Sequence, residues 1–95
     1  MALGRRKMNA EDKAVLEKLL DMFDSLYDRE SSVAEVHALI LASAEMLPRS
    51  VFTQLMHSAA ADLLAIIRSD ADDLVKNRAA LVVVQQLREE IANVV

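Results

Sequence analysis

Apolar residues recur every three or four positions along most of the chain, which is the spacing of helices that bury one face. The first such segment runs from Asn9, which has the character of an N-cap, to about Asp28. Its apolar positions fall on one arc of the helical wheel, namely Leu16, Leu19, Leu20, Phe23, Leu26 and Tyr27. The pattern predicts a helix that covers a core with this arc.

A second helix is predicted from Ser32 to about Leu47, because Ser32 and Glu35 have the spacing of a capping box. Its core arc consists of Val33, Val36, Leu39, Ile40, Met46 and Leu47. The opposite face carries little charge and holds Ala34, Ala38, Leu41 and Ala42. This helix is therefore either sandwiched inside the bundle or presents its outer face to a partner.

A third helix is predicted from Pro48, which is favoured in a first turn, to about Ser69. Its core arc consists of Phe52, Leu55, Met56, Ala59, Leu63, Ile66 and Ile67. The acidic block that follows predicts a new helix start with Ser69 or Asp70 as the cap. A single helix that continues through this block is the alternative.

The fourth helix, predicted over about 71–93, has apolar residues on two faces. One stripe consists of Val83, Val84, Leu87, Ile91 and Val94. The other apolar positions point elsewhere on the wheel and are Leu74, Val75, Ala79, Leu81 and Val82. Three interpretations follow: a central helix touched on both sides, a break near Arg78, or a surface for self-association.

The composition supports a fold made of helices, since the 95 residues include one glycine, one proline and no cysteine. We predict an all-α fold, a small single-domain bundle of about four helices joined by short polar links. The bundle is expected to span residues 9–95, after a flexible basic tail at 1–8. No apolar run approaches the roughly 20 residues of a membrane span, so we expect a soluble, cytoplasmic protein with no membrane partner.

The chain lacks the motifs of common catalytic sites. The only glycine is Gly4, which rules out a phosphate-binding loop or a nucleophile elbow. The two histidines, His37 and His57, lack the spacing of familiar metal sites. We therefore expect no enzymatic activity, no cofactor and no metal.

Charge points to a protein partner rather than to nucleic acid. The 11 basic and 15 acidic residues give a net charge of −4, whereas phosphate contacts need a basic surface. Because Arg5, Arg6 and Lys7 contribute +3 to the first nine residues, the remainder of the chain carries −7.

Four carboxylates form a line on the first predicted helix, at positions i, i+4, i+7 and i+11. They are Glu17, Asp21, Asp24 and Asp28, here called the acidic ridge, and Tyr27 lies beside them. Like charges at this spacing repel, so folding alone does not favour the arrangement. The ridge is either a docking surface for a basic protein, anchored by Tyr27, or a solvated face covered by cations from another helix or from the N-terminal cluster.

Two functions are compatible with these patterns. The stretch Leu26–Arg29, which leads through Ser32 into the second helix, resembles small helical immunity proteins of bacteria. That resemblance implies a protein that blocks a basic toxin through the acidic ridge. Our first prediction is instead a non-catalytic interaction module that self-associates, for example as a homodimer, through apolar faces of the helices at 32–47 and 71–93. Its contact residues would be Leu41, Leu81 and Val82.

Overall fold

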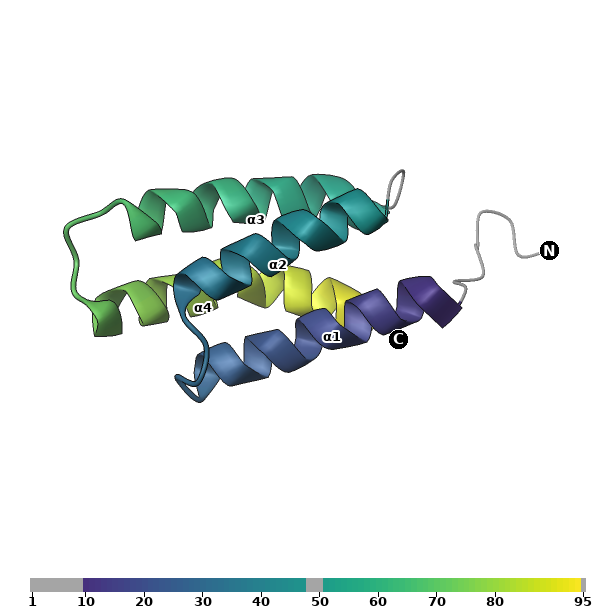
Figure 1. Ribbon diagram of the computed structural model, residues 1–95, viewed down its shortest axis with the longest axis horizontal. Coiled ribbons are helices and arrows are strands. Elements are labelled where there is room, and N and C mark those ends of the chain that lie inside the picture. The colour runs from purple at the N-terminus through teal and green to yellow at the C-terminus, as the bar shows by residue number, and fades with distance from the viewer. Residues whose placement is uncertain (1–9, 48–50, 95) are drawn as a thin grey trace.

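The computed structural model describes residues 10–47 and 51–94, which form four helices and no strand (Figure 1). The helices are α1 (Ala10–Tyr27), α2 (Val33–Met46), α3 (Val51–Ile67) and α4 (Asp73–Ala92). The prediction of a small all-α bundle is therefore confirmed. The expected cap at Asn9, the expected helix start at Pro48 and the basic tail at 1–8 lie outside the described residues.

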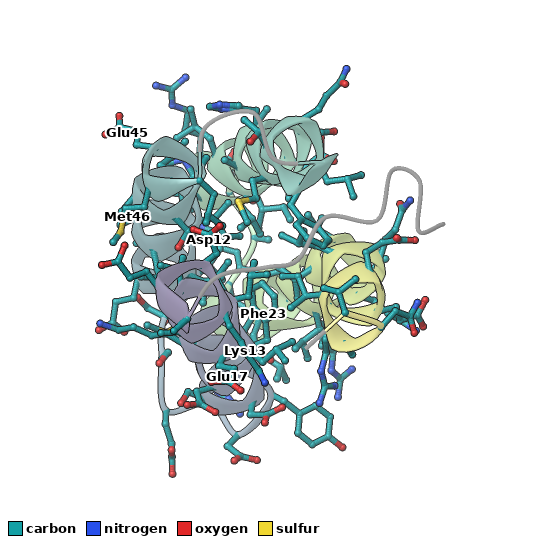
Figure 2. All side chains as sticks on the ribbon, turned by 90° about the vertical axis from the view of Figure 1, so that its right-hand side faces the viewer. Asp12, Lys13, Glu17, Phe23, Glu45 and Met46 are labelled. Atoms are coloured by element: carbon teal, nitrogen blue, oxygen red, sulfur yellow. The ribbon has the colours of Figure 1, made fainter. Side chains whose placement is uncertain are left out.

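The helices run up and down in turn, and each packs against the next along the chain (Figure 1). α4 returns to pack against α1, so these four helices occupy the corners of a square. Across the diagonal, α2 and α4 approach each other only slightly, and they lie on opposite sides of the bundle in the end-on view of Figure 2. The outer faces of α2 and α4 consequently point away from each other.

The core draws on the inner face of every helix, as the apolar arcs predict. Its buried members are Leu16, Leu19, Phe23, Leu26, Val33, Val36, Ile40, Ala44, Leu47, Phe52, Met56, Ala59, Ala60, Leu63, Ala80, Val84, Leu87 and Ile91. The most extensive packing joins α2 to α3. In α3 the small side chains of Ala59 and Ala60 are buried, and they allow a neighbouring helix to approach closely. Among the described residues, no buried side-chain nitrogen or oxygen lacks a hydrogen-bond partner.

Local capping sets the helix starts. The Ser32 Oγ accepts from the Glu35 N–H at 3.1 Å, and the Glu35 carboxylate accepts from the Ser32 N–H at 2.7 Å, which confirms the predicted capping box. The predicted cap of α4 is wrong. Asp72 takes this role by accepting from the Val75 N–H at 2.9 Å.

The link between α3 and α4 is a separate segment, so the alternative of one continuous helix is also wrong. α3 ends at Ile67, and the Ser69 hydroxyl donates to the Ile66 carbonyl at 2.7 Å. Ser69 thus helps to end α3 instead of starting α4. The Lys76 Nζ donates to the Ile67 carbonyl at 2.9 Å, which satisfies a second carbonyl at this helix end.

The turn from α1 to α2 depends on Arg29, whose backbone is left-handed with φ of 64°. The Glu30 N–H donates to the Ser25 carbonyl at 2.8 Å, and the Arg29 N–H donates to the Leu26 carbonyl at 3.0 Å. These two bonds form a Schellman motif, in which glycine is the usual left-handed residue. An arginine here carries the steric cost of its Cβ.

Three apolar residues that the wheel assigns to the core are on the surface. Tyr27 is 70% exposed, Met46 is 64% exposed and Val94 is 49% exposed. Tyr27 and Met46 are the last residues of their helices, and Val94 lies beyond the end of α4. A wheel gives the direction of a side chain but not whether a neighbouring helix extends far enough to cover it.

α4 is one unbroken helix that contacts α1 and α3 with its inner side. The predicted break near Arg78 is therefore wrong. Of the second apolar stripe, Leu81 packs against the core, whereas Val75 is 52% exposed and Val82 is 73% exposed, so α4 is covered on this side only in part.

Candidate functional site

The outer face of α2 consists of uncharged side chains over most of the helix. Four exposed apolar residues, Ala34, Ala38, Leu41 and Ala42, are hereafter called the α2 outer face, and the exposed charged residues Glu35 and Glu45 lie at its two ends. Residues 36–44 contain no aspartate, glutamate, lysine or arginine. The alternative that α2 is sandwiched inside the bundle is wrong, because these four side chains reach the surface.

The packing of α2 explains why this face remains open. Its inner side is buried against α1 and α3, with Val36 and Ile40 fully covered. Glu45 and Met46, at the end of the helix, point away from the bundle in Figure 2. Three of the four outer residues are alanines, so another helix can approach the α2 backbone without displacing long side chains.

The outer face of α4 has a different character. Leu74, Val75 and Val82 lie exposed on α4, and exposed polar or charged residues also occur along this helix, namely Asp73, Arg78, Gln85, Gln86, Arg88, Glu89 and Glu90. Leu81, which was predicted to join Val82 in a contact, is only partly exposed because it packs against the core. Isolated valines among polar neighbours are ordinary for a protein surface.

All four members of the acidic ridge are exposed; Glu17, Asp21 and Asp24 lie on α1, and Asp28 is the first residue after its end. The Asp24 Oδ1 accepts from the Arg88 Nη2 of α4 at 2.8 Å, and both side chains are more than half exposed. Glu17, Asp21 and Asp28 form no ion pair within the described residues. Within residues 10–47 and 51–94, a cation from another helix therefore pairs with one acid of the ridge, Asp24.

A groove of about 460 Å³ lies between α1 and α4, beside the ridge. The buried side chains of Phe23 and Val84 contribute to its floor, and Figure 2 shows Phe23 directed toward the middle of the bundle. Tyr27, Leu81 and Arg88 also line it. The structure thus places Tyr27 on the edge of an apolar groove and next to the acids.

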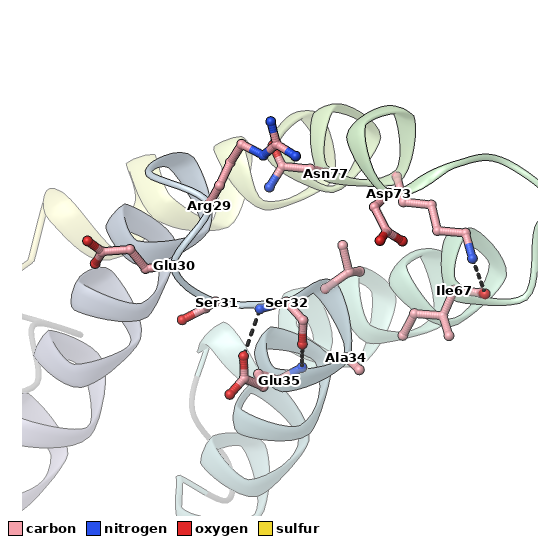
Figure 3. A pocket seen from close by; sticks show the side chains of 11 residues that line it. Arg29, Glu30, Ser31, Ser32, Ala34, Glu35, Ile67, Asp73 and Asn77 are labelled. Atoms are coloured by element: carbon pink, nitrogen blue, oxygen red, sulfur yellow. Dashed lines mark hydrogen bonds between the residues drawn. The ribbon is translucent and has the colours of Figure 1, made fainter.

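A second groove, of about 510 Å³, lies where the α1–α2 turn meets the ends of α3 and α4 (Figure 3). Four of its polar side chains form hydrogen bonds at helix ends. The Asn77 Nδ2 donates to the Leu26 carbonyl at 2.9 Å, Lys76 binds the end of α3, and Ser32 and Glu35 form the capping box. Arg29, Glu30 and Asp73 also line this groove.

Sequence reasoning missed the residues that join distant helices. Asn77 and Leu26 are 51 residues apart, and Arg88 and Asp24 are 64 residues apart. Neither contact can be predicted from the spacing of the two residues in the sequence. A hydrophilic residue on the flank of an apolar helix face, as Asn77 is, was the only available signal.

No three histidine, cysteine or acidic residues in the described part of the chain lie close enough to hold a metal ion. None of its helices is long and apolar enough to cross a membrane. Comparisons of the chain with protein-family models, with curated proteins and with solved structures give no match.

Proposed function

We propose that the protein is a non-catalytic helical interaction module that binds a second copy of itself through the α2 outer face. The observation that carries this proposal is the absence of charge over residues 36–44 of a helix whose outer side is exposed. A solvated helix face normally carries charged residues, and a continuous uncharged face is typical of a contact surface.

A second copy is the partner that fits this face best. Covering an uncharged surface with a charged one would remove charges from water without pairing them, which is costly. The α2 outer face of another copy has no such charges. A two-fold axis would place the two α2 helices against each other, and the alanines would let them approach closely.

The positions of α2 and α4 limit how copies can associate. Because their outer faces point away from each other, one symmetric contact can contain only one of them. A contact of α2 with α4 of the next copy would repeat into rings or open chains. We therefore assign the contact to Leu41 and its alanine neighbours, and the self-association predicted for Leu81 and Val82 becomes the alternative to be tested.

The test uses two substitutions that add the same charge on opposite sides of the bundle. Ala38→Glu places a carboxylate in the proposed contact, and Val82→Glu places one on α4. Solution mass is measured by light scattering on a sizing column, and circular dichroism checks helicity. We expect dimers for the unmodified protein and for Val82→Glu, and monomers of unchanged helicity for Ala38→Glu. A dimer of Ala38→Glu contradicts the proposal, and dissociation by Val82→Glu alone moves the contact to α4.

A second candidate function is that of an immunity-type protein, which would bind a basic partner through the acidic ridge. It is favoured by the exposed Tyr27 next to Asp28 and by the exposed acids Glu17, Asp21 and Asp28, which form no ion pair within the described residues. Negative potential speeds encounter with a basic protein, and exposed tyrosines often anchor such contacts. This function and dimerisation use different sides of the bundle, so they are compatible.

A further inference from the structure

The groove between α1 and α4 combines an apolar floor with an acidic edge. Phe23 and Val84 are each only 2% exposed, and Tyr27 rises beside them with most of its surface open. An apolar side chain from a partner can rest against Tyr27 and Leu81 above this floor. This apolar contact would add binding energy and specificity to the interaction between charges.

The acidic edge has the period of a helix. Glu17, Asp21, Asp24 and Asp28 follow α1 over about 16 Å, at a rise of roughly 1.5 Å per residue. Lysines or arginines at i, i+4, i+7 and i+11 of a second helix lying along α1 would meet these acids one by one. An extended peptide presents its side chains with a period of two and does not match this spacing.

We propose that this groove binds an amphipathic helix of another protein, with basic residues along the acidic ridge and an apolar side chain against Tyr27 and Leu81. The inference rests on the second candidate function, the binding of a basic partner, and it names the chemistry and the shape of that partner. It does not depend on dimerisation through α2, because α2 and the α1–α4 groove lie on different sides of the bundle.

A basic partner can displace Arg88 from Asp24. Its ion pair with Asp24 is exposed on both sides, and exposed pairs contribute little to stability. An incoming lysine can therefore take its place on Asp24, and the displaced guanidinium stays on the α4 edge of the groove near Glu89. The ion pair covers one acid of the ridge until a basic helix arrives.

The test uses a synthetic helical peptide with lysines at i, i+4, i+7 and i+11 and leucines on the adjacent stripe. A control peptide carries glutamates in place of the lysines. Affinity for the full-length chain is measured by calorimetry at low and at moderate salt, and the bound region is mapped by NMR chemical shifts. We expect the lysine peptide alone to bind, with shifts along α1 and α4, and its affinity to fall as salt is added.

Two pairs of variants separate the ridge from the groove. The ridge variant Glu17→Gln/Asp21→Asn/Asp28→Asn is matched by Glu45→Gln/Asp62→Asn/Glu90→Gln, which removes the same charge elsewhere on the surface. Tyr27→Ala is matched by Val82→Ala. We expect the ridge variant to weaken binding about tenfold, since each exposed pair contributes up to a few-fold. We expect Tyr27→Ala to weaken it at least several-fold, and both matched controls to bind like the unmodified protein.

Each result has a defined meaning. Equal loss with the ridge variant and its matched control contradicts both the groove and the second candidate function, because charge in general would then be responsible. Loss with the ridge variant but not with Tyr27→Ala contradicts the groove and leaves a basic partner on the ridge. No binding of the lysine peptide, binding in an extended conformation, or shifts confined to α2 and α3 overturns the inference.

Discussion

The α2–α3 side and the α1–α4 side of this bundle differ in how closely their helices pack. α2 and α3 share the most extensive packing in the bundle, and the Thr53 Oγ1 donates to the Leu47 carbonyl at 2.9 Å between them. α1 and α4 are also joined by two polar contacts at the periphery, from Asn77 to the Leu26 carbonyl and from Arg88 to Asp24. They leave a groove between them.

The difference extends to the outer surfaces. α2 presents an uncharged face, which suits a second uncharged surface, whereas α1 presents a line of acids beside an apolar groove, which suits a basic partner. The four helices have similar apolar inner faces, yet the bundle carries one surface suited to an uncharged partner and another suited to a basic partner. The two sides differ in their exposed residues, which do not contribute to the core.

The largest expected effect tests whether the two faces of α2 have separate roles. Ile40 is fully buried, and its neighbour Leu41 is 37% exposed. Ile40→Ala should lower the free energy of unfolding by about 2–5 kcal/mol, because it leaves a cavity in the core. Leu41→Ala should cost less than about 1 kcal/mol, since its side chain is already partly in water. Both stability changes are measured by urea denaturation in an Ala38→Glu background, in which we expect the protein to be monomeric. Equal losses of stability from the two substitutions would mean that α2 has no separate outer face.

The next effect concerns the polar contact that joins α4 to the end of α1. Asn77→Ala removes the side-chain donor to the Leu26 carbonyl and should lower stability by about 0.5–1.5 kcal/mol. The carbonyl keeps its bond from the Arg29 N–H, which limits the loss. Thermal unfolding with the mass measured in parallel checks this prediction. Unchanged stability would show that packing alone holds the α1–α4 side.

A smaller and opposite effect is expected at the turn shared by the two sides. Arg29→Gly removes the Cβ from a left-handed position and should raise stability by about 0.5–1 kcal/mol, after the greater freedom of glycine in the unfolded chain is deducted. Because the turn lies in neither proposed contact surface, solution mass should not change. Destabilisation by this variant would mean that the Arg29 side chain makes a contact that outweighs its backbone cost.

The smallest effect concerns the ion pair at the edge of the groove. A double-mutant cycle with Asp24→Asn and Arg88→Gln should give a coupling of about 0.2–1 kcal/mol, because both side chains are largely exposed. The coupling should shrink toward zero at about 1 M salt, where charges are screened within roughly 3 Å. A larger coupling that survives high salt would mean that the pair fixes the α1–α4 side instead of yielding to a partner.

Much of the fold follows from periodicity and capping chemistry. The repeat of apolar residues predicts each helix and most of the core, and the Ser32 and Glu35 pair predicts a capping box that the structure contains. These features are local, since they depend on residues within one or two turns of each other. The acidic block predicts a helix start, but its cap was predicted at Ser69 or Asp70, and the structure places it at Asp72.

What the sequence did not predict depends on contacts between distant segments. The exposure of Tyr27 follows from where α4 lies relative to the end of α1, and a helical wheel contains no such information. Asn77 and Arg88, which lie in α4, bind Leu26 and Asp24 of α1, at the other end of the sequence. The candidate surfaces themselves were visible as an uncharged stretch and a line of acids, but their separation onto different sides of the bundle required the fold.

We propose above all that a second copy of the protein binds to α2. The mass of the unmodified protein in solution tests this self-association most directly. Light scattering over a series of concentrations at moderate salt, where the ridge is screened, reports on the apolar contact alone. We expect a dimer at high concentration and dissociation into monomers on dilution, because a contact made by one helix face buries a small area. A monomer at every concentration would contradict it.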